Sequence, residues 1–347
     1  MRGSRAILPL LSLVVLTISL HAQSPVFSQY YASGLYLNPA LSGLEKDIFL
    51  GMNYRSQWSN LSTPFNTFQF SFIHPLTKPG VRTKHMGGFG ASFLNDVAGP
   101  NKEFITQGVT IAGAYNFHLN RFGNNIVSIG LQVGATQQRI NYDALQWSTQ
   151  YNPATGYDNG LAGESGSLNN QVLTPTVNVG AMWYYTTKNR MSRQSLSMFS
   201  GLAVSNLVRP DGFIQDSRGA SMLLFKLHGG LSSTWKRKYE ISPNYLVQYQ
   251  NQSFQVNLGT YIGYYLQSGP LQNSKSKKVL FGAWYRLQDA FIFSTGFSTT
   301  VWNIGFSHDT NVSSLGRNLG TASAYELSFA YKIIVHKGFK RFSSPLI

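Results

Sequence analysis

The strongest constraint on the fold is an alternation of side chains that runs through most of residues 104–138. Val109, Ile111, Ile129 and Leu131 belong to the apolar set, and the residues between them are mainly small or polar. A period of two places the two sets on opposite faces of a β-strand. Both runs are longer than the roughly five or six residues typical of strands in soluble proteins. An apolar outer face and an uncharged polar inner face are typical of a hairpin in a transmembrane β-barrel.

The composition agrees with a surface in contact with lipid. Only 12% of the 347 residues are charged, whereas 14% are aromatic. A soluble domain normally has about 25% charged residues. A surface that faces hydrocarbon explains the missing charge.

The same alternation predicts an all-β fold, a transmembrane antiparallel β-barrel of about 14 strands over residues 48–347. An even number of strands suits a bacterial barrel in which both chain termini lie on the periplasmic side. The expected strands cover residues 48–55, 66–73, 85–95, 104–119, 125–140, 173–186, 195–205, 224–236, 240–249, 253–266, 279–286, 289–298, 300–308 and 324–334.

Residues 1–22 have the features of a secretory signal peptide. Arg2 and Arg5 form a basic start, residues 6–20 are apolar, and cleavage is expected near Ala22. The alternative is a transmembrane anchor, but spanning a bilayer takes about 20 apolar residues. We expect Sec-type export to the outer membrane.

Residues 23–47 do not alternate and are expected to form a plug. They contain several aromatic residues and no charge before Glu45, so they should pack against another part of the chain. Barrels of eight strands are filled by side chains, and barrels of sixteen or more leave a channel. A fourteen-stranded barrel lies between these cases, and we expect residues 23–47 to occupy its lumen or its periplasmic mouth.

Connection lengths predict which end of the barrel faces outward. If the chain starts in the periplasm, the long connections 141–172, 206–223 and 309–323 lie outside, as in bacterial outer-membrane barrels. The short connections are basic. This predicts either a solvated polar rim or a periplasmic face that contacts an anionic leaflet or an acidic partner. Its candidate residues are Lys188, Arg190, Arg193, Lys236, Arg237, Lys238, Lys275, Lys277 and Lys278.

Some other residues allow two interpretations. Gly87, Gly88 and Gly90 suggest a phosphate loop, but they lie in a predicted strand, where glycine relieving a bend is the better interpretation. Asp309 and Glu326 are expected to be pore or rim groups, with Glu326 hydrated in the lumen. Aromatic residues near strand ends predict either interfacial girdles or cross-strand packing. They are Trp147, Trp183, Tyr184, Trp235 and Trp284.

No pattern in the sequence predicts catalysis or a cofactor. There is no cysteine, and the seven histidines show neither an i,i+4 pair nor a nearby acidic cluster. There is no Gly-x-Ser-x-Gly motif. The basic residues lie in separate turns of a secreted chain. We therefore expect neither an enzyme nor nucleic-acid binding.

Several short motifs resemble those of the PorP/SprF family of type IX secretion system membrane proteins. The first contains Phe27, Gln29 and Tyr30, followed by Asn38 and Pro39. The second contains Asn53, Tyr54, Arg55 and Trp58. Weaker matches follow at 282–286, 307–313 and 325–328, although His308 and Thr310 depart from the pattern.

The resemblance implies an outer-membrane barrel of Bacteroidota that is similar in architecture to fatty-acid-transporter barrels. Family members work in type IX secretion and gliding motility. They assist export or surface attachment of large adhesins by docking the C-terminal domain of the cargo, and they couple to periplasmic proteins or lipoproteins. The alternative function is an outer-membrane channel or transporter for small hydrophobic or polar solutes.

Overall fold

The computed structural model describes most of the chain after the predicted signal peptide. The described residues are 24–58, 63–78, 84–120, 123–158, 160–161, 170–189, 194–208, 223–236, 238–251, 253–267, 277–313 and 323–335. The expected signal peptide, residues 1–22, and its cleavage site near Ala22 lie outside them.

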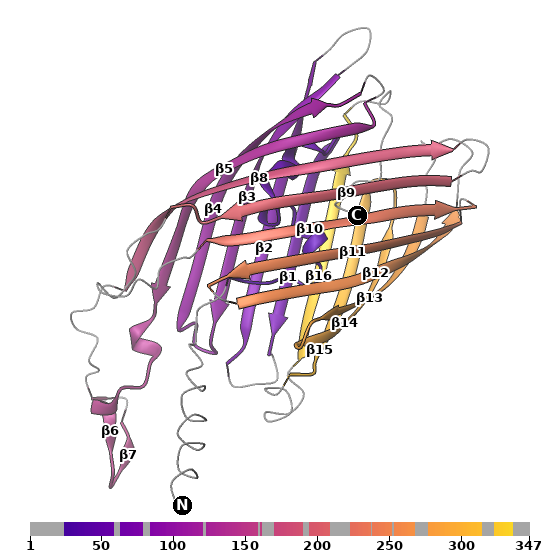
Figure 1. Ribbon diagram of the computed structural model, residues 1–347. Coiled ribbons are helices and arrows are strands. Elements are labelled where there is room, and N and C mark those ends of the chain that lie inside the picture. The colour runs from indigo at the N-terminus through magenta and orange to yellow at the C-terminus, as the bar shows by residue number, and fades with distance from the viewer. Residues whose placement is uncertain are drawn as a thin grey trace, which may run out of the picture.

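Within this part of the chain, fourteen antiparallel strands form one closed barrel, which confirms the predicted fold (Figure 1). Neighbouring strands in the chain pair with each other, and the first strand, β1, closes the barrel by pairing with the last, β16. The barrel strands are β1 (Ile48–Gln57), β2 (Phe65–Lys78), β3 (Lys84–Ala98), β4 (Phe104–His118), β5 (Asn125–Ile140), β8 (Gln171–Asn189), β9 (Gln194–Ser205), β10 (Leu224–Trp235), β11 (Tyr239–Gln250), β12 (Ser253–Gln267), β13 (Lys277–Arg286), β14 (Ala290–Ser298), β15 (Trp302–Asn311) and β16 (Ser323–Ile333).

Each predicted strand is present, and several are longer than expected. The long connection after β5 also contains a short hairpin that the alternation does not predict, formed by β6 (Tyr151–Asn152) and β7 (Gly156–Tyr157). Five short 3-10 helices are described, η1 (Tyr30–Ala32), η2 (Gly34–Tyr36), η3 (Pro39–Gly43), η4 (Tyr142–Ala144) and η5 (Ser148–Gln150). None of the helices in the described residues is long and apolar enough to span a membrane.

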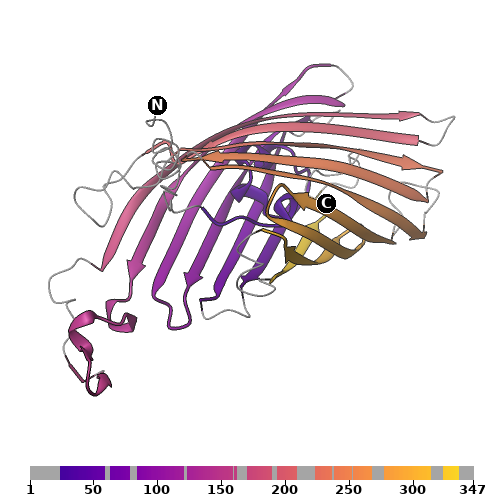
Figure 2. The same ribbon diagram turned by 60° about the horizontal axis from the view of Figure 1, so that its bottom comes forward.

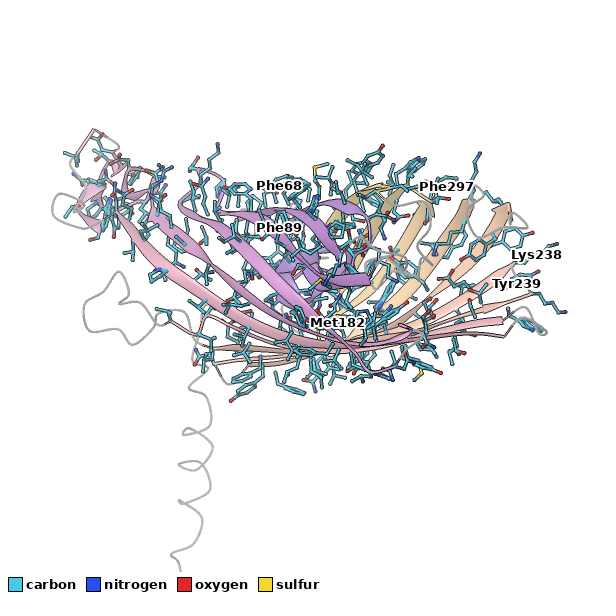
Figure 3. All side chains as sticks on the ribbon, turned by 90° about the horizontal axis from the view of Figure 1, so that it is seen from above. Phe68, Phe89, Met182, Lys238, Tyr239 and Phe297 are labelled. Atoms are coloured by element: carbon cyan, nitrogen blue, oxygen red, sulfur yellow. The ribbon has the colours of Figure 1, made fainter. Side chains whose placement is uncertain are left out.

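The two faces of the wall are those predicted from the alternation. Val109 and Ile111 on β4 are 59% and 62% exposed, whereas Ser128 and Gln132 on β5 are buried inside the barrel. The view from above shows side chains on both sides of the wall (Figure 3), and Met182 on β8 is buried on the inner side. The outward surface is thus a continuous apolar belt of the kind that lipid covers.

The connections define two ends of the barrel. The three longest, at 141–170, 206–223 and 312–322, all leave the same end, which we call the long-connection end. β1 begins and β16 finishes at the opposite, short-connection end, which also carries the turns at 119–124, 236–238 and 299–301. The pattern of outer-membrane barrels, with long connections outside, predicts that the long-connection end faces the cell exterior.

The assignment of faces leads to a prediction about membrane insertion. Val109→Arg should lower the amount of inserted barrel, because an arginine at mid-bilayer on the lipid face costs about 2–4 kcal/mol. Thr110→Arg places the same charge on the lumen side and should have the smaller effect. The measurement is the fraction of folded protein in outer membranes, from the shift in gel mobility on heating. Equal losses in the two variants would mean that the faces are assigned wrongly.

Candidate functional site

Residues 24–47 lie inside the barrel and run along the lumen between its two ends (Figures 1 and 2). At the long-connection end, the Ser24 N–H donates to Gln250 Oε1 over 3.0 Å, and Gln250 is the last residue of β11. At the short-connection end, Glu45 forms an ion pair with Lys332 at 3.4 Å. We call residues 24–47 the plug, and the expectation that this segment occupies the lumen is confirmed.

The first strong anchor of the plug is at Ser28 and Gln29. Their consecutive backbone N–H groups donate to the two carboxylate oxygens of Glu326, over 2.7 and 3.1 Å. The Gln29 side chain donates to the Glu326 carbonyl oxygen and to Ser307 Oγ, and it accepts from Ser328 Oγ. Two residues of the plug thereby satisfy polar groups on β15 and β16.

Ser28 also lies on a buried ionic cluster, which consists of Arg55, Arg286, Asp309 and Glu326. Arg55 is 3.0 Å from Asp309 and 3.4 Å from Glu326, and Arg286 is 3.2 Å from Asp309. Ser28 Oγ donates to Asp309 over 2.6 Å and accepts from both arginines. Two positive and two negative groups compensate each other here, as buried charges require.

The ionic cluster also lies on the strand pair that closes the barrel. Arg55 on β1 and Glu326 on β16 are direct partners in the register. Arg286 comes from β13 and Asp309 from β15, so four strands contribute to one site. Glu326 is therefore not a hydrated pore group, as the sequence suggested, because main-chain N–H groups and arginine replace its water.

A second anchor forms around Asn38 in the middle of the plug. Its side-chain oxygen accepts from the Ala40 N–H over 2.9 Å and caps η3, in which Pro39 is the first residue. Its Nδ2 contacts His228 Nε2 at 3.1 Å and donates to the carbonyl oxygens of Ala181 and Leu202. The Asn-Pro pair thus starts a helical turn and ties it to β8, β9 and β10.

Glycines in the wall make room for this close approach. A Cβ atom added at Gly180 would overlap the Asn38 amide, and one added at Gly130 would overlap the backbone at Ala40. At Gly88 an added Cβ would overlap the carbonyl oxygen of Ser42. Close contact with the plug, rather than a bend of the strand, is thus the reason for glycine at position 88.

Aromatic side chains fill the space between the two anchors. Tyr31 stacks on Trp284 with ring centroids 5.8 Å apart, and its hydroxyl hydrogen-bonds to that of Tyr261. The Tyr30 hydroxyl and the Trp284 indole N–H both donate to Asn244 Oδ1, over 2.6 and 2.7 Å. Both tyrosines are buried, and the hydroxyl of each has a hydrogen-bonding partner on the wall.

A lysine that the sequence analysis did not single out also holds the plug. Lys226 on β10 is buried, and its ammonium donates to the Tyr36 carbonyl oxygen over 2.6 Å. It also lies 4.1 Å from the centroid of the Tyr36 ring, a cation–π contact. The ring of Phe27 packs edge-on against Tyr36 at 5.4 Å. The only signal for Lys226 in the sequence was its charge at a lumen-facing position of a predicted membrane strand.

Not all of the predicted motif residues meet at the plug. Tyr54 faces outward from β1 and is 47% exposed, and Trp58 packs edge-on against Phe65 at the long-connection end. Trp183 and Trp235 face outward, as an aromatic girdle requires, but Trp284 and Tyr184 are buried inside. Both rows of the strand at 279–286 contain large apolar residues, so its inner face was ambiguous in sequence.

The candidate basic face is only partly described. Lys236, Lys238 and Lys277 are exposed at the short-connection end. Lys278 instead lies 3.3 Å from the buried Glu240, which compensates its charge. Lys188 lies in β8, but its side chain is not among those described. The other candidates, Arg190, Arg193, Arg237 and Lys275, lie outside the described residues. Among the residues with described side chains, no group of three or more histidine, cysteine, aspartate or glutamate residues is placed to hold a metal ion.

The buried ionic cluster leads to a prediction about stability. Arg55→Leu should lower the free energy of unfolding by about 3–5 kcal/mol, because it leaves buried carboxylates without their partner. Asp289→Asn is the control. Asp289 also pairs with Arg286, but its side chain is 43% exposed, and the change should cost less than about 1 kcal/mol. Urea unfolding in detergent measures both. Similar losses in the two variants would contradict the importance of the buried cluster.

The wall glycines provide a matched pair of substitutions. Gly180→Ala should push the plug away from the wall at Asn38 and destabilise the protein by about 1–3 kcal/mol, as overpacking does. A Cβ atom added at Gly113 meets no atom within 4 Å, so Gly113→Ala should have little effect. Limited proteolysis of the plug and thermal unfolding would show the difference. An unchanged Gly180→Ala protein would mean that the plug does not contact the wall there.

Comparison with solved structures finds other outer-membrane barrels. The CymD monoaromatic hydrocarbon channel is 14% identical and has a TM-score of 0.42, with 88% of this chain and 94% of that chain covered. The Ralstonia pickettii toluene transporter TbuX is 10% identical and has a TM-score of 0.44, with coverages of 87% and 93%. A Pseudomonas aeruginosa FadL homologue is 11% identical and has a TM-score of 0.39, with coverages of 85% and 92%.

Comparison with curated proteins finds no match. The family model described as "Type IX secretion system membrane protein PorP/SprF" matches residues 19–331. This range includes the plug and the strands that hold it, and the match confirms the resemblance identified from the motifs. The chain therefore belongs to the PorP/SprF family of type IX secretion system membrane proteins.

Proposed function

We propose that this outer-membrane barrel is a closed docking platform of the type IX secretion system. In this proposal, the long-connection end holds the C-terminal domain of an adhesin-type cargo and assists its export or its attachment to the cell surface. The short-connection end contacts periplasmic secretion or motility proteins, or lipoproteins. Family membership supports the place in secretion, and the plug bound inside the lumen supports docking over conduction.

The plug bound inside the lumen is the observation that carries the proposal. Ser28, Gln29 and Asn38 are almost completely buried between the strands, at 2%, 1% and 0% exposure. The plug is held by ion-paired groups and by glycines that fit its backbone, so moving it would expose several polar groups at once. A barrel closed in this way leaves its rims and connections as the surfaces for partners.

The basic residues at the short-connection end suit an acidic partner surface. Lys236, Lys238 and Lys277 are exposed there, and exposed charges of one sign steer association with the opposite sign. Charge reversal at Lys236 and Lys238 should therefore weaken binding to a periplasmic partner and make the remaining binding less sensitive to salt.

One pair of measurements tests docking against conduction. The intact protein in planar bilayers should show almost no conductance, and a variant without residues 24–43 should conduct if it folds, as its gel mobility before heating would show. In mildly solubilised outer membranes, the intact protein should co-purify with a large surface protein or a periplasmic lipoprotein. A large conductance of the intact protein with no such partner would instead indicate a solute channel.

A further inference from the structure

The plug runs through the lumen in a direction that places its two ends on opposite sides of the membrane. Its first described residue, Ser24, is bound by Gln250 at the long-connection end. Its last residues reach the short-connection end, where the Val335 N–H donates to Asp47 Oδ1 over 3.3 Å. The chain then reverses and enters the wall as β1. The N-terminal end of the plug is therefore opposite to the end at which β1 begins.

Contacts with the wall occur along the whole course of the plug. Ser28 and Gln29 bind β1, β13, β15 and β16 near the long-connection end. Asn38 binds the middle of the wall at β8, β9 and β10. Nearer the short-connection end, the Asn116 amide on β4 hydrogen-bonds to the carbonyl oxygen of Gly43, and Ser128 on β5 donates to that of Ala40. The plug is thus one continuous element fixed to the wall at both ends and between them.

The two ends of the plug are more exposed than most of its middle. Ser24, Pro25 and Val26 are partly exposed, residues 27–43 are buried except for the partly exposed Tyr36, and partial exposure returns at Leu44 and Lys46. Burial lowers the pKa of the Lys46 amine to about 7, against the attraction of Asp47. The short-connection end of the plug therefore has ionisable groups.

The rim around Ser24, at the long-connection end, is uncharged, unlike the short-connection end of the plug. A small pocket there is lined by uncharged residues, Ser24, Val26, Leu224, Gln248, Gln250, Ser253 and Gln255. Gln250 already shows what such a rim can bind, because its amide accepts the main-chain N–H of Ser24 and donates to Ser24 Oγ. Amide side chains without charge suit an extended polypeptide that is recognised through main-chain hydrogen bonds.

We propose that the N-terminal end of the plug, Ser24 to Val26, is presented at the cell surface and forms, with the uncharged rim of β11 and β12, a binding element for an extended polypeptide of the secreted cargo. This rests on the proposed function for the identity of the partner. The plug then connects the surface site to the periplasmic mouth through one continuous set of contacts.

The absence of cysteine from the chain allows a direct test of the position of Ser24. The Ser24→Cys variant in intact cells should react with a membrane-impermeant maleimide carrying polyethylene glycol, as Asn101→Cys in the exposed connection between β3 and β4 should. Lys238→Cys, in the turn between β10 and β11, should react only after the outer membrane is permeabilised. Reaction of Ser24→Cys only after permeabilisation would overturn the proposal.

A second variant covers the case in which the thiol of Ser24→Cys is shielded under all conditions. An epitope inserted immediately before Ser24 should bind its antibody on intact cells, and failure to bind until permeabilisation would also overturn surface presentation.

The binding role has a separate readout in the amount of cargo displayed on the cell surface. Polyethylene glycol attached to the Ser24→Cys variant should lower this amount several-fold, because the polymer covers the rim. The same group attached to the Asn101→Cys variant should leave it unchanged. Unchanged display with labelled Ser24→Cys protein would reject the binding element.

These readouts separate the failure of this inference from failure of the proposed function. If the cells display their surface proteins normally without this barrel, the secretion role is wrong, but labelling of Ser24→Cys still reports the course of the plug. If secretion depends on the barrel and Ser24→Cys is labelled only from the periplasm, the docking proposal stands and the surface site is wrong. Co-purified cargo should also remain bound at high salt concentration if the uncharged rim holds it.

Discussion

The rest of this structure depends on the hydrogen bonds that two main-chain N–H groups of the plug donate to the Glu326 carboxylate. A buried carboxylate is costly unless it is paired and hydrogen-bonded. In this lumen its partners are Arg55 on the closing strand pair and the N–H groups of Ser28 and Gln29. The barrel wall therefore contains a buried carboxylate, and the correctly placed plug donates the hydrogen bonds that this carboxylate needs. Closure of the barrel and placement of the plug are parts of one arrangement.

This arrangement explains why motifs that are far apart in the sequence belong to one family pattern. Ser28, Arg55, Arg286, Asp309 and Glu326 lie in different motif segments and form a single cluster around the start of the plug. Asn38 and Pro39 serve a different purpose, because they start a helical turn where wall glycines allow close approach. Tyr54 and Trp58 lie away from the plug, and nothing in the described contacts connects them with it. The motif residues thus largely make the contacts that hold the plug against the wall.

Sequence reasoning recovered the parts of this structure that have a local signal. Alternation with a period of two records which face of a strand meets lipid, so Val109 and Ile129 could be placed on the outside and the number of strands could be read. The low charge and high aromatic content of residues 23–47 indicated that they would pack against another part of the chain. The contacts across the lumen have no such signal, since Ser28 and Glu326 are 298 positions apart. The inner position of Trp284 could have been inferred only from Arg286, which shares its face of β13.

The most direct test of the account is hydrogen exchange at the backbone amides of Ser28 and Gln29, measured on the protein in lipid nanodiscs. If Glu326 holds the plug closed, these two amides should exchange as slowly as the paired amides of β1, and Glu326→Gln should speed their exchange more than that of β4. Rapid exchange at Ser28 and Gln29 in the unaltered protein, while the amides of β1 stay protected, would show that the plug is not fixed in the lumen and would contradict the central claim.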